Sequence, residues 1–306
     1  MTNMPTMEEM LKAGVHFGHQ VSKRHPRMQP YIFGVRNGVT VIDLEQTTQK
    51  LKEALDFVRK VVSDGGLVIF VGTKRQAKDL VKKHAMDCGM PYVVNRWMGG
   101  TLTNFDVINK LIRKYKDLRV KQDSGELAKY TKKEQSSINK YLNKQEEMVG
   151  GLLSLNKIPA ALFLVDIKVE ATAKAEAISQ GVPLVAITDS NVSPDGINYP
   201  IPANDDATRS IDLITSLIAQ AAKEGMAARP VVAAPAPVQK APAKPVVPTA
   251  RPGMAPAGGP LSAKTPSSGP LTGKTPAAPL KTVVAQEQLK TAVKEAAKPT
   301  NKTNAK

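Results

Sequence analysis

The chain has 306 residues, 42% of them hydrophobic and only 4% aromatic, which is typical of one or two globular domains with an aliphatic core. Lysine and arginine number 43 against 27 acidic residues, and the net charge of +16 favours a polyanionic partner such as nucleic acid or anionic lipid. No apolar run approaches the roughly 18 residues of a membrane span, and a single cysteine, Cys88, excludes an internal disulfide, so we expect a cytoplasmic protein.

The first expected elements are a β-hairpin and a helix. YIFGVRNGVTVIDL, residues 31–44, predicts a hairpin turning at Asn37–Gly38, because both residues tolerate a positive φ. Asp43 predicts the cap of a helix that extends to about residue 63. Beyond it we expect strands at 67–72, 92–94, 161–166 and 183–188, and helices at 74–88, 169–180 and 205–224. Apolar strands separated by helices indicate a doubly wound α/β domain, in which a parallel sheet is covered on both faces.

Residues 103–153 interrupt this alternation. Two stripes of apolar residues at helical spacing flank the sequence QDSG at 122–125, and Thr131 with Glu134 predicts a capping box at the start of the second helix. These features predict an antiparallel helical hairpin of the coiled-coil type. Lysine and arginine crowd its outer face, where an ordinary solvated helix surface is the alternative to a binding surface.

The last 77 residues differ from the rest of the chain. Residues 230–306 hold 14 of the 23 prolines and only two acids, Glu287 and Glu295, so they are basic and poor in large apolar side chains. We expect a disordered tail with a short helix at 282–298, which either contacts RNA weakly or has no defined partner. The expected domains are a discontinuous α/β domain at 1–105 and 154–229, an inserted hairpin at 106–153, and the tail.

Two segments suggest enzyme chemistry without completing it. VGTKRQA follows a predicted strand but has no GxxxxGK[ST] or GxGxxG pattern, and Thr73 with Gln76 reads as a capping box for the next helix. The segment 189–206 gathers the carboxylates of Asp189, Asp195, Asp205 and Asp206 after a predicted strand, where a hydrolase could hold magnesium. A turn and a helix start, with Asn204 as the cap, account for the same residues. We therefore predict no catalytic residue and no enzyme activity.

The motif GVHFGH places His16 and His19 three residues apart. Such spacing suits one helical face, and a metal would then require Asp189 or Asp205 to join from elsewhere in the fold. The alternatives are buried, hydrogen-bonded histidines or polar anchors against a partner. The sequence leaves this choice open, and we predict neither a cofactor nor a firm metal site.

Basic residues interleaved with polar and aromatic ones occur in two further stretches. SKRHPRMQPYIFGVRNG and NRWMGGTLTNF combine lysine and arginine with turn residues, an arrangement that can neutralise phosphates at fixed spacings. Trp97 is expected to pack in the core beneath its loop rather than to stack on a base. A nucleic-acid scaffold is therefore favoured over an enzyme that uses the aspartates and over a free-standing nucleic-acid or membrane-surface protein.

The ordered motifs resemble one known family. AGVHFGH, HPRMQPYIFGVRNG, VIDLEQT, IFVGTKRQA, YVVNRWMGGTLTN, the hairpin with YTKKE, and IPANDDATRSI follow the pattern of bacterial small-subunit ribosomal protein number two. The resemblance covers residues 7 to about 225. It implies a flavodoxin-like domain with an inserted helical hairpin, and no enzyme activity. It also implies binding to ribosomal RNA between the head and body of the small subunit, beside a neighbouring protein, the mRNA-binding ribosomal protein number one, which it helps to dock.

The resemblance and the charge pattern together select the residues expected to contact RNA. They are Lys23, Arg24, Arg27, Arg36, Asn37, Lys74, Arg75, Arg96, Asn104, Lys110, Arg113 and Lys114.

Overall fold

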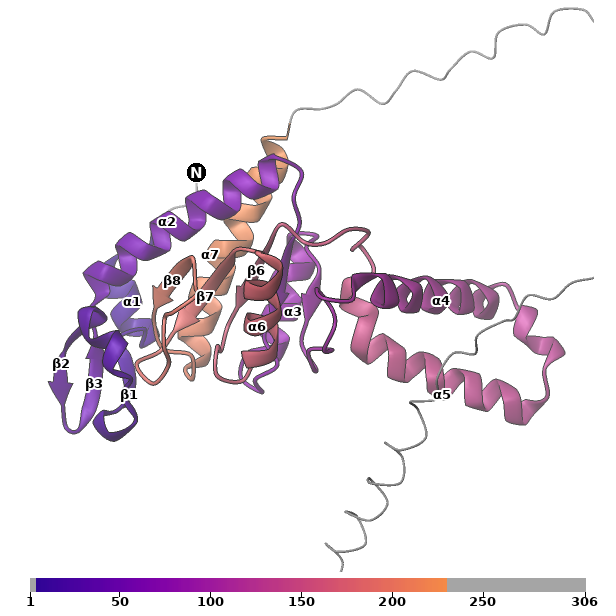
Figure 1. Cartoon of the computed structure of the whole chain (residues 1–306), viewed down its shortest axis with the longest axis horizontal. Coiled ribbons are helices and arrows are strands. Elements are labelled where there is room, and N and C mark those ends of the chain that lie inside the picture. The colour runs from indigo at the N-terminus through magenta and orange to yellow at the C-terminus, as the bar shows by residue number, and fades with distance from the viewer. Residues whose placement is uncertain (1–3, 230–306) are drawn as a thin grey trace, which may run out of the picture. The chain divides into compact units, whose positions relative to one another are not determined.

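Five of the apolar runs assemble into a single parallel sheet in the computed structural model, which describes residues 4–229 (Figure 1). The strands are β4 (Val68–Val71), β5 (Tyr92–Val93), β6 (Ala161–Leu164), β7 (Leu184–Thr188) and β8 (Tyr199–Pro202). Their spatial order is β5-β4-β6-β7-β8, with every neighbouring pair parallel. Counted by appearance, this is the order 2-1-3-4-5 of flavodoxin-like sheets. The predicted α/β doubly wound class is confirmed, while the predicted tail and its helix at 282–298 lie outside the described residues.

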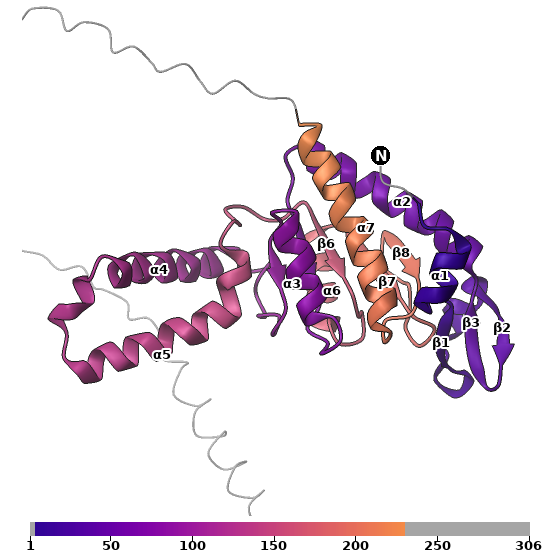
Figure 2. The ribbon, with the colours of Figure 1, turned by 180° about the vertical axis from the view of Figure 1, so that it is seen from behind.

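Helices cover both faces of this sheet, as Figures 1 and 2 show from opposite sides. The first face carries α2 (Leu44–Ser63), α3 (Lys78–Asp87) and α7 (Thr208–Ala227), and the second carries α6 (Ala171–Gln180). Side chains alternate along each strand, so Phe70 and Phe163 enter the first core while Ile69 and Leu162 enter the second. All four are fully buried, which explains why these strands read as uninterrupted apolar runs.

A second, antiparallel sheet precedes the parallel one. Its strands are β1 (Phe17–Gln20), β2 (Ile32–Arg36) and β3 (Val39–Ile42), in the order β1-β3-β2, and helix α1 (Met7–Ala13) leads into them. Asn37 and Gly38 have φ values of 51° and 75°, which confirms the predicted turn. Strand β1 rests on the loop after β7, where a Cβ on Gly18 would lie 2.7 Å from Ser190 Oγ. A glycine is therefore required where the two sheets meet.

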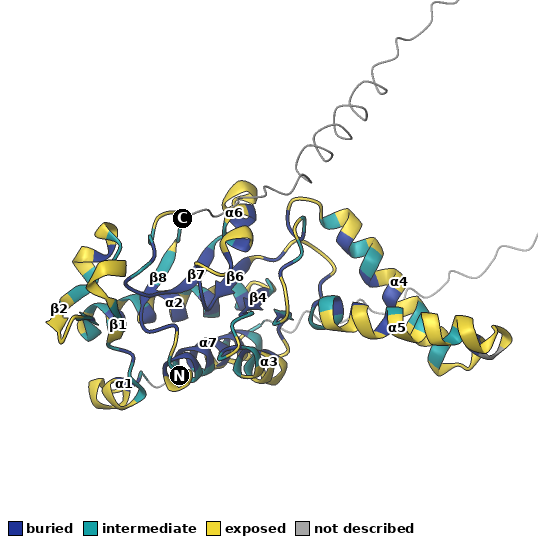
Figure 3. Ribbon diagram, turned by 90° about the horizontal axis from the view of Figure 1, so that it is seen from below, coloured by how far each residue is buried: buried dark blue, intermediate teal, exposed yellow. Residues whose placement is uncertain are grey.

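The inserted segment forms the predicted pair of antiparallel helices, α4 (Phe105–Asp123) and α5 (Lys132–Val149). The capping box of Thr131 and Glu134 is present at the start of α5. Ile112 and Leu142 belong to the second core at the base of the hairpin, and most of the remaining hairpin surface is exposed (Figure 3). The body thus anchors one end of the hairpin and leaves its length accessible.

The structure corrects several expected boundaries. Helix α3 begins at Lys78 rather than at 74, and its N-cap is Ala77, whose methyl side chain cannot make a capping hydrogen bond. The expected capping box of Thr73 and Gln76 is therefore not formed, and the Thr73 N–H donates to Glu170 Oε1 at 2.9 Å. Helix α7 begins at Thr208 rather than at 205. Strand β8 was not expected, since its two prolines argue against a strand, but as the edge strand it tolerates them. Neither α1 nor β1 was expected, because both are too short to show a periodic pattern.

We expect Phe163→Ala to lower the free energy of unfolding by about 3–5 kcal/mol, because it removes a fully buried ring. That ring lies edge-on to Phe70, with centroids 5.4 Å apart. Urea unfolding followed by circular dichroism measures the change. The control is Phe33→Ala, whose side chain is 81% exposed and which should change the value by less than about 0.5 kcal/mol. Equal losses in the two variants would contradict the assigned core.

Candidate nucleic-acid interface

Most of the residues expected to contact RNA gather at one edge of the parallel sheet. Lys74 and Arg75 follow β4, and Arg96 follows β5. The stretch from Lys23 to Arg27 reaches the same edge, because the His25 N–H donates to Ser190 O, after β7, at 2.8 Å. Since the carboxyl ends of parallel strands share one edge, residues far apart in sequence become neighbours here.

The turn between β2 and β3 joins this group. The Val21 N–H donates to Gly38 O at 3.1 Å, which places Arg36 and Asn37 beside the stretch that begins at Lys23. We call this surface the basic edge. It comprises Lys23, Arg24, Arg27, Arg36, Asn37, Arg75 and Arg96. All of these side chains are exposed except that of Arg24, which is half-buried.

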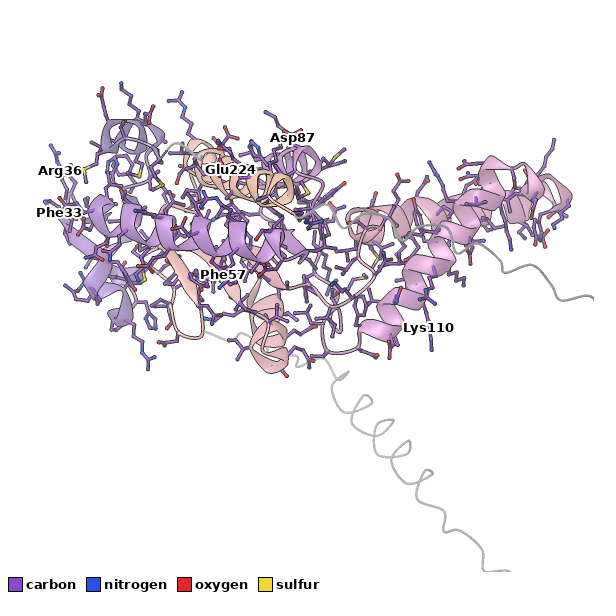
Figure 4. The ribbon with its side chains drawn as sticks, turned by 90° about the horizontal axis from the view of Figure 1, so that it is seen from above. Phe33, Arg36, Phe57, Asp87, Lys110 and Glu224 are labelled. Carbon is purple, nitrogen blue, oxygen red and sulfur yellow. The ribbon has the colours of Figure 1, made fainter. Side chains whose placement is uncertain are left out.

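The other predicted residues lie on the hairpin. Asn104 occupies the N-cap position of α4, and its exposed side chain makes no capping hydrogen bond. Lys110, Arg113 and Lys114 are exposed along α4, and the Lys114 ammonium lies 5.3 Å from the centroid of the Tyr141 ring on α5. Figure 4 shows Arg36 at one end of the body and Lys110 well away from it, on the hairpin. The predicted contacts therefore form two surfaces, the basic edge and the hairpin.

Lys74 differs from the other predicted contacts because its ammonium is directed into the protein. Nζ lies 3.2 Å from Asp166 Oδ2, 3.0 Å from Asp205 Oδ1 and 2.6 Å from Asp206 Oδ1. Burial alone would lower the pKa of Lys74, but these carboxylates outweigh it and raise the pKa. The sequence could not reveal this pairing, since the partners follow strands β6 and β8. Lys74 therefore neutralises buried acids instead of being presented to solvent.

His19 joins the same group of charges. Its Nδ1 lies 3.1 Å from Asp189 Oδ2 and its Nε2 lies 3.4 Å from Asp206 Oδ2. The hydrogen bond to Asp189 is the largest of the effects that raise the pKa of His19. Asp205 is almost fully buried, and burial, together with the charges of Asp166 and Asp189, raises its pKa to about 7. Folding thus raises the pKa of two bases, Lys74 and His19, and of one acid, Asp205, within a single cluster.

The two histidines of GVHFGH do not share a site. Residues 17–20 form a strand rather than a helix, and the ring of His16 lies 4.0 Å from that of Phe17. Burial lowers the pKa of His16, in contrast to His19. Of the described residues, His19, Asp205 and Asp206 could offer ligand atoms to a metal, all within 4.8 Å of one another. The Lys74 ammonium already supplies a cation to both aspartates.

Side chains of the chain itself fill the crevice where flavodoxin-like sheets bind ligands. In this strand order the crevice lies between β4 and β6, at their carboxyl ends. Here the Lys74 ammonium contacts Asp166, and the Glu170 carboxylate accepts the Thr73 N–H that a phosphate would otherwise accept. The crevice is therefore built as an internal ion network. Of the carboxylates that suggested a magnesium site, Asp205 and Asp206 take part in it through Lys74. Asp195 instead pairs with Arg27 of the basic edge.

Three further features were not anticipated from the sequence. Lys168 is exposed just after β6 and extends the basic edge, and its position after a predicted strand could have revealed it. The buried Glu176 of α6 accepts backbone N–H groups from the loop that follows β5. Helix α1 and strands β1 and β2 together carry an exposed apolar face. This apolar face comprises Met7, Leu11, Phe17, Phe33 and Val35.

Within residues 4–229, no helix combines the length and the apolar character needed to cross a membrane.

Comparisons with known proteins agree on one family. Residues 10–225 match the family model described as ribosomal protein S2. A protein of Geotalea uraniireducens (strain Rf4) named small ribosomal subunit protein uS2 is 48% identical over 229 residues, which cover 75% of this chain and 89% of that protein. A protein of the same name from Fusobacterium nucleatum subsp. nucleatum is 48% identical over 221 residues, which cover 72% of this chain and 90% of that protein. The matched region includes every residue expected to contact RNA.

The charge cluster makes stability depend on pH. Folding raises the pKa of Asp205 from 3.8 to about 7 and raises that of His19 above 6.5, so the folded state binds more protons than the unfolded state. Stability should therefore fall as pH rises from 5 to 8, by at most about 1.4 kcal/mol per pH unit for each group. We expect Asp205→Asn to flatten this dependence in urea unfolding. The exposed Asp87→Asn should leave it unchanged, and parallel profiles for all three proteins would refute the assignment.

Proposed function

Because the chain belongs to the ribosomal protein S2 family, we propose that it binds ribosomal RNA through the basic edge and the hairpin. We further propose that its apolar face helps to dock the mRNA-binding ribosomal protein number one. The chain is a protein of the small ribosomal subunit and functions in the cytoplasm. Its named relatives are ribosomal proteins, which confirms the prediction that it is not an enzyme.

The basic edge supports RNA binding through its charge and its rigidity. Arg75 and Arg96 extend from loops whose strands, β4 and β5, are paired in one sheet, so their separation is fixed before RNA arrives. Lysine and arginine that replace counterions on phosphates contribute affinity that is strongest at low salt. Because the distances between these cations are fixed, a folded RNA whose phosphates have matching distances should bind better than a flexible single strand. This is a geometric, electrostatic mechanism that involves no chemical step.

The helical hairpin would extend the contact to a second region of RNA. Lys110 and Arg113 are exposed on α4, whose last buried residue is Tyr115, so its final two turns carry none. A single rigid body would thus carry positive charge both along the sheet edge and along a projecting arm. Such an arrangement suits a protein that bridges two RNA segments, and it fits a site between the head and the body of the subunit.

The apolar face supports the docking of a protein rather than of RNA. Phe33 is 81% exposed, and Phe17 and Val35 are each 51% exposed. Monomeric soluble proteins seldom expose several large apolar side chains together unless a partner covers them. Leu11 and Phe33 line adjoining hollows on this surface, which apolar side chains of a partner could fill. The neighbouring mRNA-binding ribosomal protein is the occupant that we propose.

The salt dependence of RNA binding tests the first part of this proposal. With roughly 6–10 phosphate contacts, affinity for ribosomal RNA should fall by about 10³–10⁵ between 50 and 200 mM salt. Arg75→Ala removes one exposed cation, so the slope of log K against log salt should decrease by about 0.9. Filter binding at several salt concentrations measures the slope. Lys60→Ala on α2 is the control, and a binding constant that does not respond to salt would overturn the mechanism.

Sedimentation tests the docking of the neighbouring protein. We expect Phe33→Ala to weaken docking roughly tenfold, because an exposed aromatic anchor in an interface contributes more than about 1 kcal/mol. The amount of the mRNA-binding ribosomal protein that sediments with small subunits in sucrose gradients is the measurement. Met86→Ala removes a side chain that is 60% exposed on α3 and serves as the control. Full retention of that protein by the Phe33→Ala particles would exclude the apolar face as its dock.

A further inference from the structure

The hairpin is joined to the body through a connection of irregular backbone. After β5 ends at Val93, the chain forms no helix or strand until α4 begins at Phe105. Trp97, Thr101 and Leu102 of this connection are nonetheless buried. Buried backbone N–H groups without a partner in a helix or sheet need an acceptor from elsewhere.

The carboxylate of Glu176 supplies that acceptor. Oε1 accepts the Gly100 N–H at 2.7 Å and the Trp97 indole N–H at 3.2 Å. Oε2 accepts the Leu102 N–H at 3.0 Å and the Thr103 N–H at 3.4 Å. One side chain on α6, which is 8% exposed, therefore closes a whole loop that is more than 70 residues away in sequence.

The charge of Glu176 is essential to this arrangement. Burial by itself would raise its pKa, but the N–H groups of Leu102, Gly100, Trp97 and Thr103 together outweigh burial and lower the pKa. The group is thus held as a carboxylate, whose two oxygens accept hydrogen bonds without presenting a donor. A glutamine of the same shape would turn an amide N–H₂ toward backbone N–H groups.

Two further contacts hold the exit of the hairpin, while the first turns of α4 at its entry pack into the second core through Ile108 and Ile112. The Asn95 side-chain amide donates to Glu147 O on α5 at 2.9 Å. At Gly151, just after α5, a Cβ would lie 2.1 Å from Tyr92 O, so the backbone there packs directly against β5. These contacts hold the end of α5. The direction of α4 depends on the loop that Glu176 closes, since Thr103 lies two residues before the helix.

We propose that Glu176 is a positioning residue that fixes the direction in which the helical hairpin leaves the body. The carboxylate holds the connection from Trp97 to Thr103 in one conformation, and α4 starts from that conformation. The body can then present the hairpin and the basic edge at a constant separation. The positioning role stands on the contacts alone, and only its effect on RNA binding rests on the proposed function.

Distance measurements on the free full-length chain test the positioning directly. Spin labels are attached after Ser124→Cys at the far end of α4 and Lys60→Cys on α2, both exposed positions. The native Cys88 is buried, and burial raises its pKa to about 11, so it reacts poorly with the label. In Glu176→Gln the distance distribution should broaden or shift. In Glu170→Gln, which removes a buried carboxylate of the same region that accepts from Thr73, it should not change.

Coincident distributions for Glu176→Gln and the parent would overturn the proposal. A Glu176→Gln chain that no longer unfolds cooperatively would also overturn it, because the residue would then be required for folding in general. Hydrogen exchange of the unsubstituted protein provides a second test. The Gly100 and Leu102 amides should be protected although they lie in no helix or strand, and exchange at the rate of free peptide would contradict the assigned contacts.

RNA binding distinguishes positioning from charge. Loss of a negative charge alone should strengthen binding to a polyanion, as expected for Glu53→Gln on α2. We expect Glu176→Gln instead to weaken binding about tenfold, as it would if the hairpin held its binding direction in only about a tenth of the molecules. Tighter binding by Glu176→Gln with an altered label distance would retain the positioning role and count against RNA contact by the hairpin. Unaltered label distances in Glu176→Gln would overturn the positioning role. If Arg75→Ala still lowered the salt dependence of RNA binding as expected, the proposed function would stand.

Discussion

The ammonium group of Lys74, in the loop after β4, holds together the acidic loops after β6 and β8, which would otherwise repel each other. Parallel strands end at the same edge of the sheet, so the acids that follow β6 and β8, Asp166 and Asp205, are forced into proximity and burial. A buried carboxylate without a partner costs several kcal/mol. Lys74 reaches both, and also Asp206, while His19 connects the antiparallel sheet to the same cluster. Arg75 of the basic edge follows Lys74 directly, so it extends from a loop that this cluster holds in place.

Most charges at this edge are separated by depth, and the exposed pair of Arg27 with Asp195 is an exception. The inner layer contains carboxylates whose partners are internal, since Glu170 accepts from Thr73 and Glu176 from the loop leading to α4. The outer layer contains the exposed guanidinium groups of Arg75 and Arg96. Acids that are neutralised from inside do not compete with an external polyanion for the outer bases. A strongly acidic interior and a basic surface are therefore compatible, and both follow from one edge of the sheet.

The strand order explains how a fold known for binding small ligands can serve a scaffold. Flavodoxin-like sheets bind ligands in the crevice where the strand order reverses, because helix N-termini and loops converge there. In this chain the crevice is occupied by Lys74, Asp166 and Glu170, so its polar groups stabilise the body. Contact with partners is left to the rim of the crevice, the hairpin and the apolar face. Asp205 belongs to a group of acids that resembles a catalytic cluster in the sequence, but in the folded chain it pairs with Lys74 and stabilises the body.

The sequence alone determined the elements whose pattern is local. The uninterrupted strands, the turn at Asn37–Gly38, the capping box at Thr131 and the paired helices all depend on neighbours within a few residues, and the ordered motifs indicated the family. Tertiary structure decided the rest. The orientation of Lys74, the grip of Glu176 on a loop more than 70 residues away and strand β8 with its prolines depend on contacts between distant segments. Local patterns cannot encode such contacts, because they arise only when the sheet brings its strand ends together.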